Sequence, residues 1–423
     1  MSQPTLEPEI TTDIPGPVSL EMGERLARAE ARGVTCLDPP PIFWRRAQGC
    51  NVWDVDGNRF VDLTAAFGVA NVGHAHPEVV DAISRQAGEL LHGMGDVYPP
   101  DVKLELIEAI ARRYPGGGEA RVILGTSGSD AVESAIKTAQ LASGRPGILA
   151  FEGAYHGLAF GALDTTFRED FRSPFAARLP NQTVFAPYGD LEAAKQAAAS
   201  CDFEIGAVLV EPVQGRGGER VPPRGFLSAL ADWCRESGRL LVADEIYTGF
   251  GRTGCWFACE HEDVVPDLLC MGKGMASGMP ISACAGRREV MDAWPTSTGE
   301  ALHTQTFLGH PAGCAAALAS MQVMEREGLV ARAAETGAAL LAHLETRCKE
   351  VASVREVRGK GLMIGIEVDH DGGAVRACEA ALRRGVIALP SGPRAEVVSL
   401  TPPLSIDEHA LRRAADVIVE CLA

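Results

Sequence analysis

Two carboxylates and one amine stand at the ends of short apolar runs in the middle of the chain. Glu211 follows the run AVLV, Asp244 follows LLVA, and Lys273 lies just past DLLCM. The carboxyl ends of parallel strands meet at one edge of an open sheet, which is where ligands bind. If these runs are parallel strands, the three side chains share one rim and can surround a single ligand.

Lys273 lies in the nearly uncharged segment LLCMGKGMASGMP, in a chain that has six lysines and 33 arginines. An amine removed from water has a lowered pKa and can form a Schiff base with a carbonyl compound. The alternative is an ordinary lysine on a surface loop. A buried Asp244 needs a partner, and a protonated pyridine nitrogen would be a suitable one. The carboxylate would hold the proton on that nitrogen, so that the ring can accept electrons. The alternative for Asp244 is a cap on the following turn.

The segment GTSGSD (125–130) is predicted to join a strand to a helix. Free backbone amides and hydroxyl groups at a helix N-terminus form a site for a phosphate group. Tyr155 and His156 follow another apolar run, in FEGAYHG, and add an aromatic ring that can stack on a flat ligand. The alternative for Tyr155 is a half-buried side chain on a loop.

The elements that must position these residues are short apolar runs between helical stretches. The predicted strands are 121–125, 147–151, 207–212, 240–246 and 267–271, and the predicted helices are 130–141, 190–200 and 226–236. Continuous apolar runs between helices indicate a parallel sheet buried on both faces by crossover helices.

The two ends of the chain follow other patterns. Residues 1–20 are expected to form an arm whose prolines break any helix, 21–32 a helix, and 51–68 two strands around a turn. Beyond about residue 315, two helices, strands and a helix capped near Asp407 indicate a smaller α/β domain. We therefore expect an N-terminal segment (1–60), packed on the small domain and on a partner subunit, a large domain (61–315) and a C-terminal small domain (316–423).

Composition narrows the classes of function. The 423 residues are 46% hydrophobic and 22% charged, which suits a globular protein of two or three domains. A net charge of −17 disfavours binding to nucleic acid or to anionic membranes. The twelve cysteines lack zinc-ligand spacing, so we expect free thiols and no metal site. With no signal-peptide pattern and no apolar run near the ~20 residues of a membrane span, the expected compartment is the cytoplasm.

Eight segments carry a resemblance to a known family. In chain order they are VWDVDGNRFVDL, GHAHPEVVDAI, SGSDAVESAIK, FEGAYHG, EPVQG, ADEIYTGFGRTG, PDLLCMGKG and TQTFLGHPAGCAAALA. Over nearly its whole length the chain resembles the class III pyridoxal-phosphate aminotransferases of fold type I. The resemblance implies an α/β fold with a large, mostly parallel sheet and a smaller C-terminal α/β domain. It also implies a ping-pong Schiff-base mechanism that moves a primary amino group from an ω-amino acid, a diamine or another amine to a 2-oxo acid.

The resemblance implies roles for individual residues. Lys273 would carry the pyridoxal 5'-phosphate and shuttle a proton, and Asp244 would pair with the pyridine nitrogen. Tyr155 and Ile246 would cover the two ring faces. The full set of predicted cofactor contacts is Ser127, Gly128, Ser129, Tyr155, His156, Glu211, Asp244, Ile246, Lys273 and Thr306. Thr306 would reach the phosphate of a neighbouring subunit, so the active unit is expected to be a homodimer or a dimer of dimers.

Three positions depart from the family pattern. Tyr247 stands where many members have a Gln, and Ser399 and Leu158 stand where members that bind a substrate carboxylate have an Arg. Without those arginines, Glu211 would favour a cationic group in the substrate, which indicates a diamine, an ω-amino acid or an amino sugar as donor.

The acceptor would still be a 2-oxo acid, whose carboxylate needs another arginine. Arg394, in the loop SGPRAE, is the first candidate, and Arg168 and Arg172 are the alternatives.

Other functions are alternatives to aminotransfer. A racemase or aminomutase on this fold would need Lys273 and Asp244 as well. A non-catalytic scaffold would be expected to lose the lysine. A nicotinamide enzyme is disfavoured because residues 125–130 lack the G-x-G-x-x-G spacing.

Overall fold

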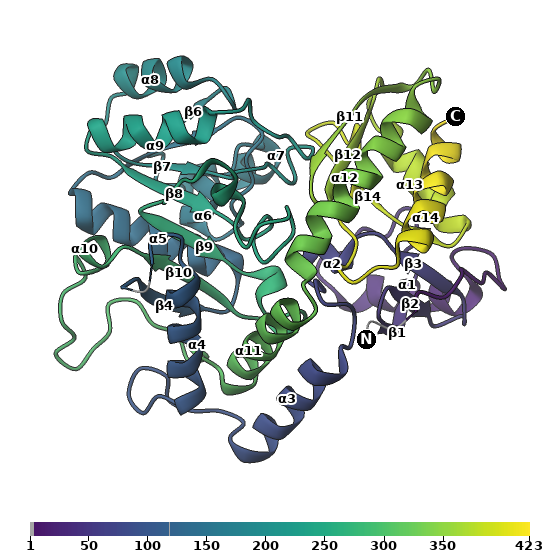
Figure 1. Ribbon diagram of the computed structural model, residues 1–423, viewed down its shortest axis with the longest axis horizontal. Helices are drawn as coiled ribbons and strands as arrows, with labels where there is room; N and C mark the ends of the chain where they lie inside the picture. Colours follow the sequence, from purple (N-terminus) through teal and green to yellow (C-terminus); the bar gives the residue numbers. More distant parts are fainter. Residues whose placement is uncertain (1–3, 118) are drawn as a thin grey trace.

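The structure is a computed structural model that describes residues 4–117 and 119–423 (Figure 1). Its centre is a seven-stranded sheet with the strand order β4-β10-β9-β8-β7-β5-β6. The strands are β4 (Arg121–Gly125), β5 (Gly147–Phe151), β6 (Thr183–Ala186), β7 (Ile205–Val210), β8 (Leu240–Asp244), β9 (Leu268–Met271) and β10 (Ser282–Gly286). All five predicted runs are strands of this sheet, and the expected mostly parallel α/β fold is confirmed.

Two strands of the large sheet, β6 and β10, were not predicted from the sequence. β6 is short, and β10, SACAG, is built from small residues. β10 runs antiparallel to both of its neighbours, β4 and β9, whereas the other paired strands of the sheet are parallel. Every residue of β7 is buried, as expected for a central strand covered by helices on both faces.

Helices connect and cover the strands. In the large-sheet half they are α3 (Pro77–Glu89), α4 (Asp101–Arg113), α5 (Gly128–Ser143), α6 (Phe160–Asp164), α7 (Glu169–Arg172), α8 (Leu191–Ser200), α9 (Phe226–Glu236) and α10 (Arg288–Met291). α5, α8 and α9 confirm the three predicted helices. α9 has the predicted bounds, and α5 (predicted as 130–141) begins two residues earlier because Ser127 and Asp130 form a capping box at its start.

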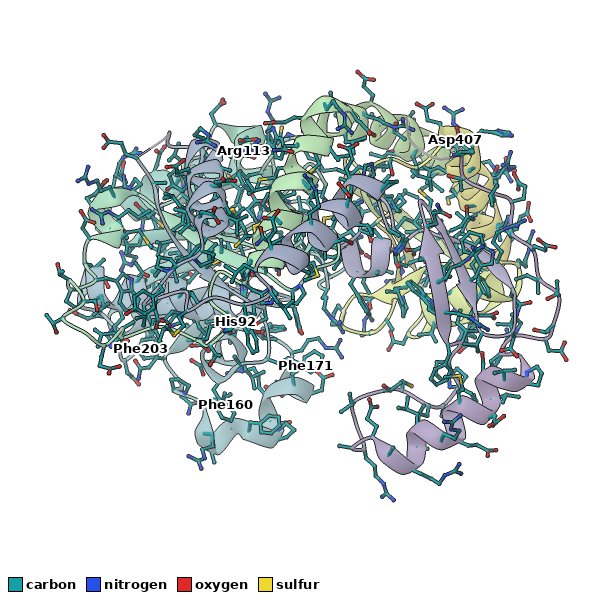
Figure 2. The ribbon with its side chains drawn as sticks, turned by 90° about the horizontal axis from the view of Figure 1, so that it is seen from below. His92, Arg113, Phe160, Phe171, Phe203 and Asp407 are labelled. Atoms are coloured by element: carbon teal, nitrogen blue, oxygen red, sulfur yellow. The ribbon has the colours of Figure 1, made fainter. Side chains whose placement is uncertain are left out.

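The C-terminal part forms a second, smaller α/β unit, on the right in Figure 1. Its sheet has the order β11-β12-β15-β14. The elements are α12 (Leu329–Cys348), β11 (Val354–Lys360), β12 (Met363–Val368), α13 (Gly373–Arg383), β13 (Val386–Ile387), β14 (Leu389–Ser391), β15 (Val397–Leu400) and α14 (Glu408–Leu422). The helix that leads into this unit, α11 (Pro311–Arg326), packs against α3 and α4 of the large-sheet half. Asp407, labelled in Figure 2, caps α14 by accepting a hydrogen bond from the Ala410 amide at 3.0 Å, as predicted.

The N-terminal segment lies against the C-terminal unit. β1 (Trp44–Gln48), β2 (Asn51–Asp54) and β3 (Arg59–Asp62) form a sheet that β13 extends in parallel to β3. The expected helix is α1 (Pro17–Ala29), and it begins earlier than predicted because proline is tolerated in the first turn of a helix. This pairing agrees with a segment over 1–60 that packs on the small domain, although the three-part division itself stays a prediction.

Membrane insertion was not expected from the sequence. Nowhere in the described part of the chain does a helix combine the length and the apolar character needed to cross a bilayer.

Candidate active site

The carboxyl ends of neighbouring strands bring the chemistry-bearing residues together. Glu211 follows β7, Asp244 ends β8, and Lys273 follows β9 after one glycine. All three line one cavity of about 210 Å³, which we call the inner cavity. Every predicted cofactor contact except Thr306 lies on its wall.

Lys273 presents its amine to the inner cavity from a strained position. Its backbone has a φ of 41°, in the left-handed region that side-chain-bearing residues rarely adopt. The Nζ atom lies 4.4 Å from the centre of the Tyr247 ring. Burial lowers the pKa of Lys273, although the carboxylates of Asp244 and Glu211 oppose that shift. Such strain and such a pKa are typical of a reactive group rather than of a surface lysine.

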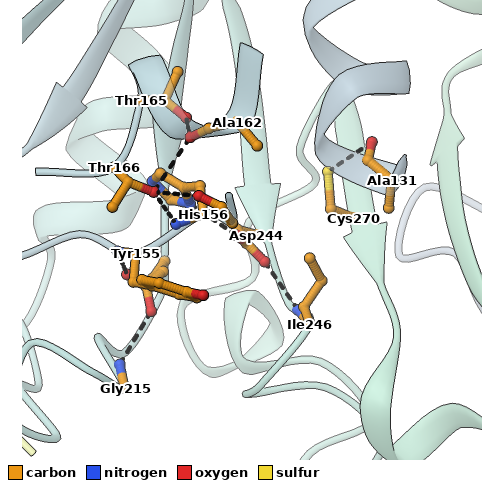
Figure 3. A network of polar contacts seen from close by, with 12 residues as sticks. Ala131, Tyr155, His156, Ala162, Thr165, Thr166, Gly215, Asp244, Ile246 and Cys270 are labelled. Atoms are coloured by element: carbon orange, nitrogen blue, oxygen red, sulfur yellow. Dashed lines mark hydrogen bonds and ion pairs between the residues drawn. The ribbon is translucent and has the colours of Figure 1, made fainter. Parts of the chain in front are cut away.

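Asp244 is buried and held by neighbours that leave it able to bind a ligand (Figure 3). Its Oδ2 lies 2.7 Å from His156 Nδ1, and its Oδ1 accepts a hydrogen bond from the Ile246 amide at 3.1 Å. An ionised carboxylate accepts about four hydrogen bonds, so Asp244 can accept another from a ring N–H. The other ring nitrogen of His156 is buried and has no partner among the described residues.

The turn before α5 is built to bind an anion. The Asp130 carboxylate accepts hydrogen bonds from the amides of Thr126 and Ser127, both at 2.9 Å. The next amides, those of Gly128 and Ser129, begin the helix and have no intrahelical acceptor. A phosphate group can accept hydrogen bonds from these amides and gains from the helix dipole.

Two unlike side chains stand on either side of Asp244 in Figure 3, the Tyr155 ring and Ile246. Ile246 packs tightly against Gly128, where a Cβ atom would lie 3.0 Å from its Cδ1. Tyr155 is fixed by an edge-on contact with Phe171, with 5.8 Å between the ring centres. An aromatic ring and an aliphatic side chain on one cavity wall suit a flat ring. Together with the amine, the acid and the anion site, they fit pyridoxal phosphate.

Glu211 is bound by the backbone rather than left free. Its two carboxylate oxygens accept hydrogen bonds from the amides of Tyr155 and Gly215, each at 3.0 Å. Burial raises its pKa, and the neighbouring His156 and the two amides oppose that shift. Glu211 therefore lies beside the inner cavity as a fixed acceptor.

A larger cavity of about 670 Å³ opens from the same lysine, and we call it the outer cavity. It shares Tyr155, Arg216, Tyr247 and Lys273 with the inner cavity. Its far wall comes from the C-terminal sheet and includes Ser391, Arg394 and Ser399, and it also contains Glu219. Glu219 was not among the predicted residues.

The three arginines predicted for the acceptor are not equally placed. Arg394 lines the outer cavity, is half exposed and pairs with Asp371 at 3.2 Å. Arg168 lines it too and pairs with Asp170. Arg172 lines neither cavity.

Arg216 was missed by the sequence analysis. Its guanidinium lies 5.0 Å from the centre of the Tyr155 ring, on the wall of both cavities. It forms no ion pair with any residue that the structure describes. Its glycine-rich context, QGRGG, resembles that of Lys273 and was the available signal.

Thr306 lies outside both cavities and is exposed. Its neighbour Gln305 does reach the anion site, because the Thr126 hydroxyl donates a hydrogen bond to Gln305 Oε1 at 3.0 Å. The segment that carries Thr306 is thus attached to the turn before α5 of the same chain.

Comparison with known proteins agrees with this geometry. Residues 35–422 match the family model described as Aminotransferase class-III. The chain is 37% identical to a 4-aminobutyrate aminotransferase of Mycobacterium leprae, over 98% of each chain. It is 39% identical to an acetylornithine aminotransferase of Methanopyrus kandleri, over 90% of this chain and 94% of that one. An amine transaminase from an uncultivated Pseudomonas species, solved with bound pyridoxal phosphate, superposes with a TM-score of 0.83 at 30% identity, over 93% of this chain and 96% of that one.

Proposed function

The chain belongs to the class III aminotransferases and uses pyridoxal phosphate, and we propose that its donor is an ω-amino acid or a diamine and its acceptor a 2-oxo acid. The observation that carries the site assignment is the half-buried Lys273 amine, which shares the inner cavity with Asp244 and the anion-binding turn. The relatives named above act, by their names, on donors whose amine is remote from a carboxylate, which supports the donor class.

Pyridoxal phosphate, when bound, supplies an electron sink for the carbanion formed on the substrate. Lys273 Nζ would hold the cofactor and then move the proton between the substrate carbon and the cofactor. A lowered pKa suits this role, because more of the amine is neutral and able to accept a proton near neutral pH. The Asp244 carboxylate would keep the ring nitrogen protonated, with His156 holding Asp244 in place.

The acceptor's carboxylate would bind on the wall of the outer cavity. Arg216 is the candidate that the structure favours, since it lacks an ion-pair partner among the described residues and lines both cavities. Arg394, predicted from the sequence, remains the competing candidate. Arginine suits this task because its planar fork binds a carboxylate with two hydrogen bonds.

We also propose a homodimer. Four large apolar side chains near Thr306 in sequence or space are between 55% and 72% exposed: Leu91, Tyr98, Leu302 and Phe307. The segments that carry them touch, because His92 packs against Phe307 with 5.3 Å between the rings. Exposed apolar groups of this kind mark a protein–protein interface, and a second copy of the chain would bury them. Thr306 would then lie at the border of the two subunits.

The cytoplasm remains the proposed compartment. All twelve cysteines are free thiols in the structure, which suits a reducing environment.

Absorbance titration of the cofactor-loaded protein tests the proposed function. Addition of an ω-amino acid or a diamine should convert the aldehyde form to the amine form, and a 2-oxo acid should restore the first spectrum. If a chiral amino acid instead loses its optical rotation with no 2-oxo acid present, the racemase alternative is favoured.

A further inference from the structure

Glu219 is a buried carboxylate on the wall of the outer cavity with no cationic partner. It is fully shielded from solvent, and no residue that the structure describes forms an ion pair with it. The hydroxyls of Ser391 and Ser399 each donate a hydrogen bond to one of its oxygens. The nearest guanidinium, Arg358, binds the Gly218 carbonyl and pairs with Glu356 and Glu367.

The backbone around Glu219 is shaped to present this side chain. Glu219 has a φ of 46°, in the left-handed region that glutamate rarely adopts. On the facing strand β12, residue 365 is a glycine, and a Cβ atom there would lie 3.0 Å from Glu219 Cβ. A strained, closely packed acid in a cavity points to a role in binding, because neither feature is needed to hold two serines.

The Tyr247 ring borders the reacting amine on the wall of the outer cavity. Lys273 Nζ sits 4.4 Å from the centre of that ring. The Tyr247 hydroxyl lies 3.1 Å from that of Thr401, two residues after Ser399, whose hydroxyl binds Glu219. Burial and then the charge of Glu219 raise the pKa of Tyr247, which agrees with this proximity. Lys273, Tyr247 and Glu219 all line the outer cavity. A donor that reacts at Lys273 can therefore extend along the ring and place its far end beside Glu219.

We propose that Glu219, held by Ser391 and Ser399, binds a second ammonium group at the far end of the donor. The donor class would be a diamine, and a donor whose far end carries a carboxylate and no ammonium group would be disfavoured. A buried carboxylate without a counter-ion is costly, and a ligand cation would offset that cost. This inference rests on the proposed function, whose reaction at Lys273 it makes more specific.

Three donors of similar length test the proposal: 1,4-diaminobutane, 1-aminopentane and 4-aminobutyrate. The measurement is kcat/KM for conversion of the cofactor-loaded enzyme by each donor. Glu219→Gln keeps the shape of the side chain and removes its charge. In this variant the ratio of kcat/KM for 1,4-diaminobutane to that for 1-aminopentane should fall by about 10-fold or more, which corresponds to the loss of a hydrogen bond to a charged group. The ratio for aminobutyrate over aminopentane should rise.

The matched control is Glu245→Gln, which removes another fully buried acid that lines neither cavity. If the role of Glu219 is purely structural, Glu219→Gln would change kcat/KM for all three donors by the same factor. That result would overturn the inference and leave the proposed function standing. A wild-type enzyme that converts no amine would overturn both. If Glu219→Gln does not fold, Ser391→Ala should lower the diaminobutane ratio by roughly 3-fold through loss of one hydrogen bond.

Discussion

The inner and outer cavities meet at Lys273 but are built in different ways. The inner cavity is formed by the ends of the adjacent strands β9, β8, β7 and β5 and by the start of α5, which follows β4 of the same sheet. The outer cavity lies between loops of the large-sheet half and β14 and β15 of the C-terminal sheet. Groups for the chemistry thus come from a single sheet, whereas groups that would choose the substrate come from two units that face each other.

The largest expected effect is at the point where the cavities meet. Lys273→Ala should lower the turnover number on the order of 10⁴-fold, because no other amine lines the inner cavity among the described residues. Steady-state kinetics with a donor and a 2-oxo acid measure the loss. Lys349→Ala, an exposed lysine on the C-terminal side, is the control and should keep full activity. Activity in the Lys273 variant above a tenth of wild type would contradict the assignment.

A change confined to the inner cavity should affect every substrate alike. Asp244→Asn should lower turnover by roughly 100-fold for all donors, since the neutral amide cannot stabilise a positive charge on the ring nitrogen. The neighbouring acid Glu245 hydrogen-bonds to Thr248 and the Cys259 amide, away from both cavities, so Glu245→Gln is the matched control. An equal loss in both variants would show that Asp244 acts through stability alone.

A change confined to the outer cavity should affect one half-reaction. Arg216→Ala should raise KM for the 2-oxo acid about 10-fold or more, with little change for a diamine donor, because a charged hydrogen bond to the carboxylate is lost. Arg394→Ala is the comparison, since that guanidinium already pairs with Asp371. A larger effect from Arg394→Ala would restore the prediction made from the sequence.

The pH dependence of the preference between donors should further distinguish the role of the outer cavity from that of the inner cavity. Burial raises the pKa of Glu219 to about 7, and Ser391, Ser399, Arg358, Glu211 and Tyr247 are the polar and charged groups around it. Below that pH the acid is neutral and cannot attract a second ammonium group. The kcat/KM ratio of 1,4-diaminobutane to 1-aminopentane should therefore rise roughly 10-fold from about pH 6 to about pH 8. A flat ratio would contradict the role of Glu219.

The smallest expected effect is on stability. A buried acid whose pKa is raised on folding stabilises the protein at low pH, and that contribution is lost as pH rises through the folded-state value of about 7. Glu219→Gln should therefore raise the melting temperature by a few degrees at about pH 8 relative to wild type, and less at about pH 5. Thermal unfolding of both proteins at the two pH values measures this change in melting temperature. A larger increase at the lower pH than at the higher pH would contradict the raised pKa of Glu219.

The contrast between the cavities also explains what the sequence could predict. Glu211, Asp244 and Lys273 could be grouped because each follows an apolar run, and the edge of a parallel sheet brings such positions together. Glu219 and Ser399 are 180 residues apart and meet only because the loop after β7 packs against the C-terminal sheet. No local pattern encodes that meeting.

Other misses have equally specific causes. β10 was overlooked because its small residues give little apolar signal. Arg394 was favoured for its loop, but Asp371, in the turn before α13, pairs with its guanidinium, and the distance between the two residues in sequence concealed this contact.

The most direct test of the central claim is to reduce the cofactor-loaded protein with borohydride, digest it and map the labelled peptide by mass spectrometry. We expect the label on Lys273, in the peptide that contains MGKGM. A label on any other lysine, or no label in protein that has bound the cofactor, would contradict the account.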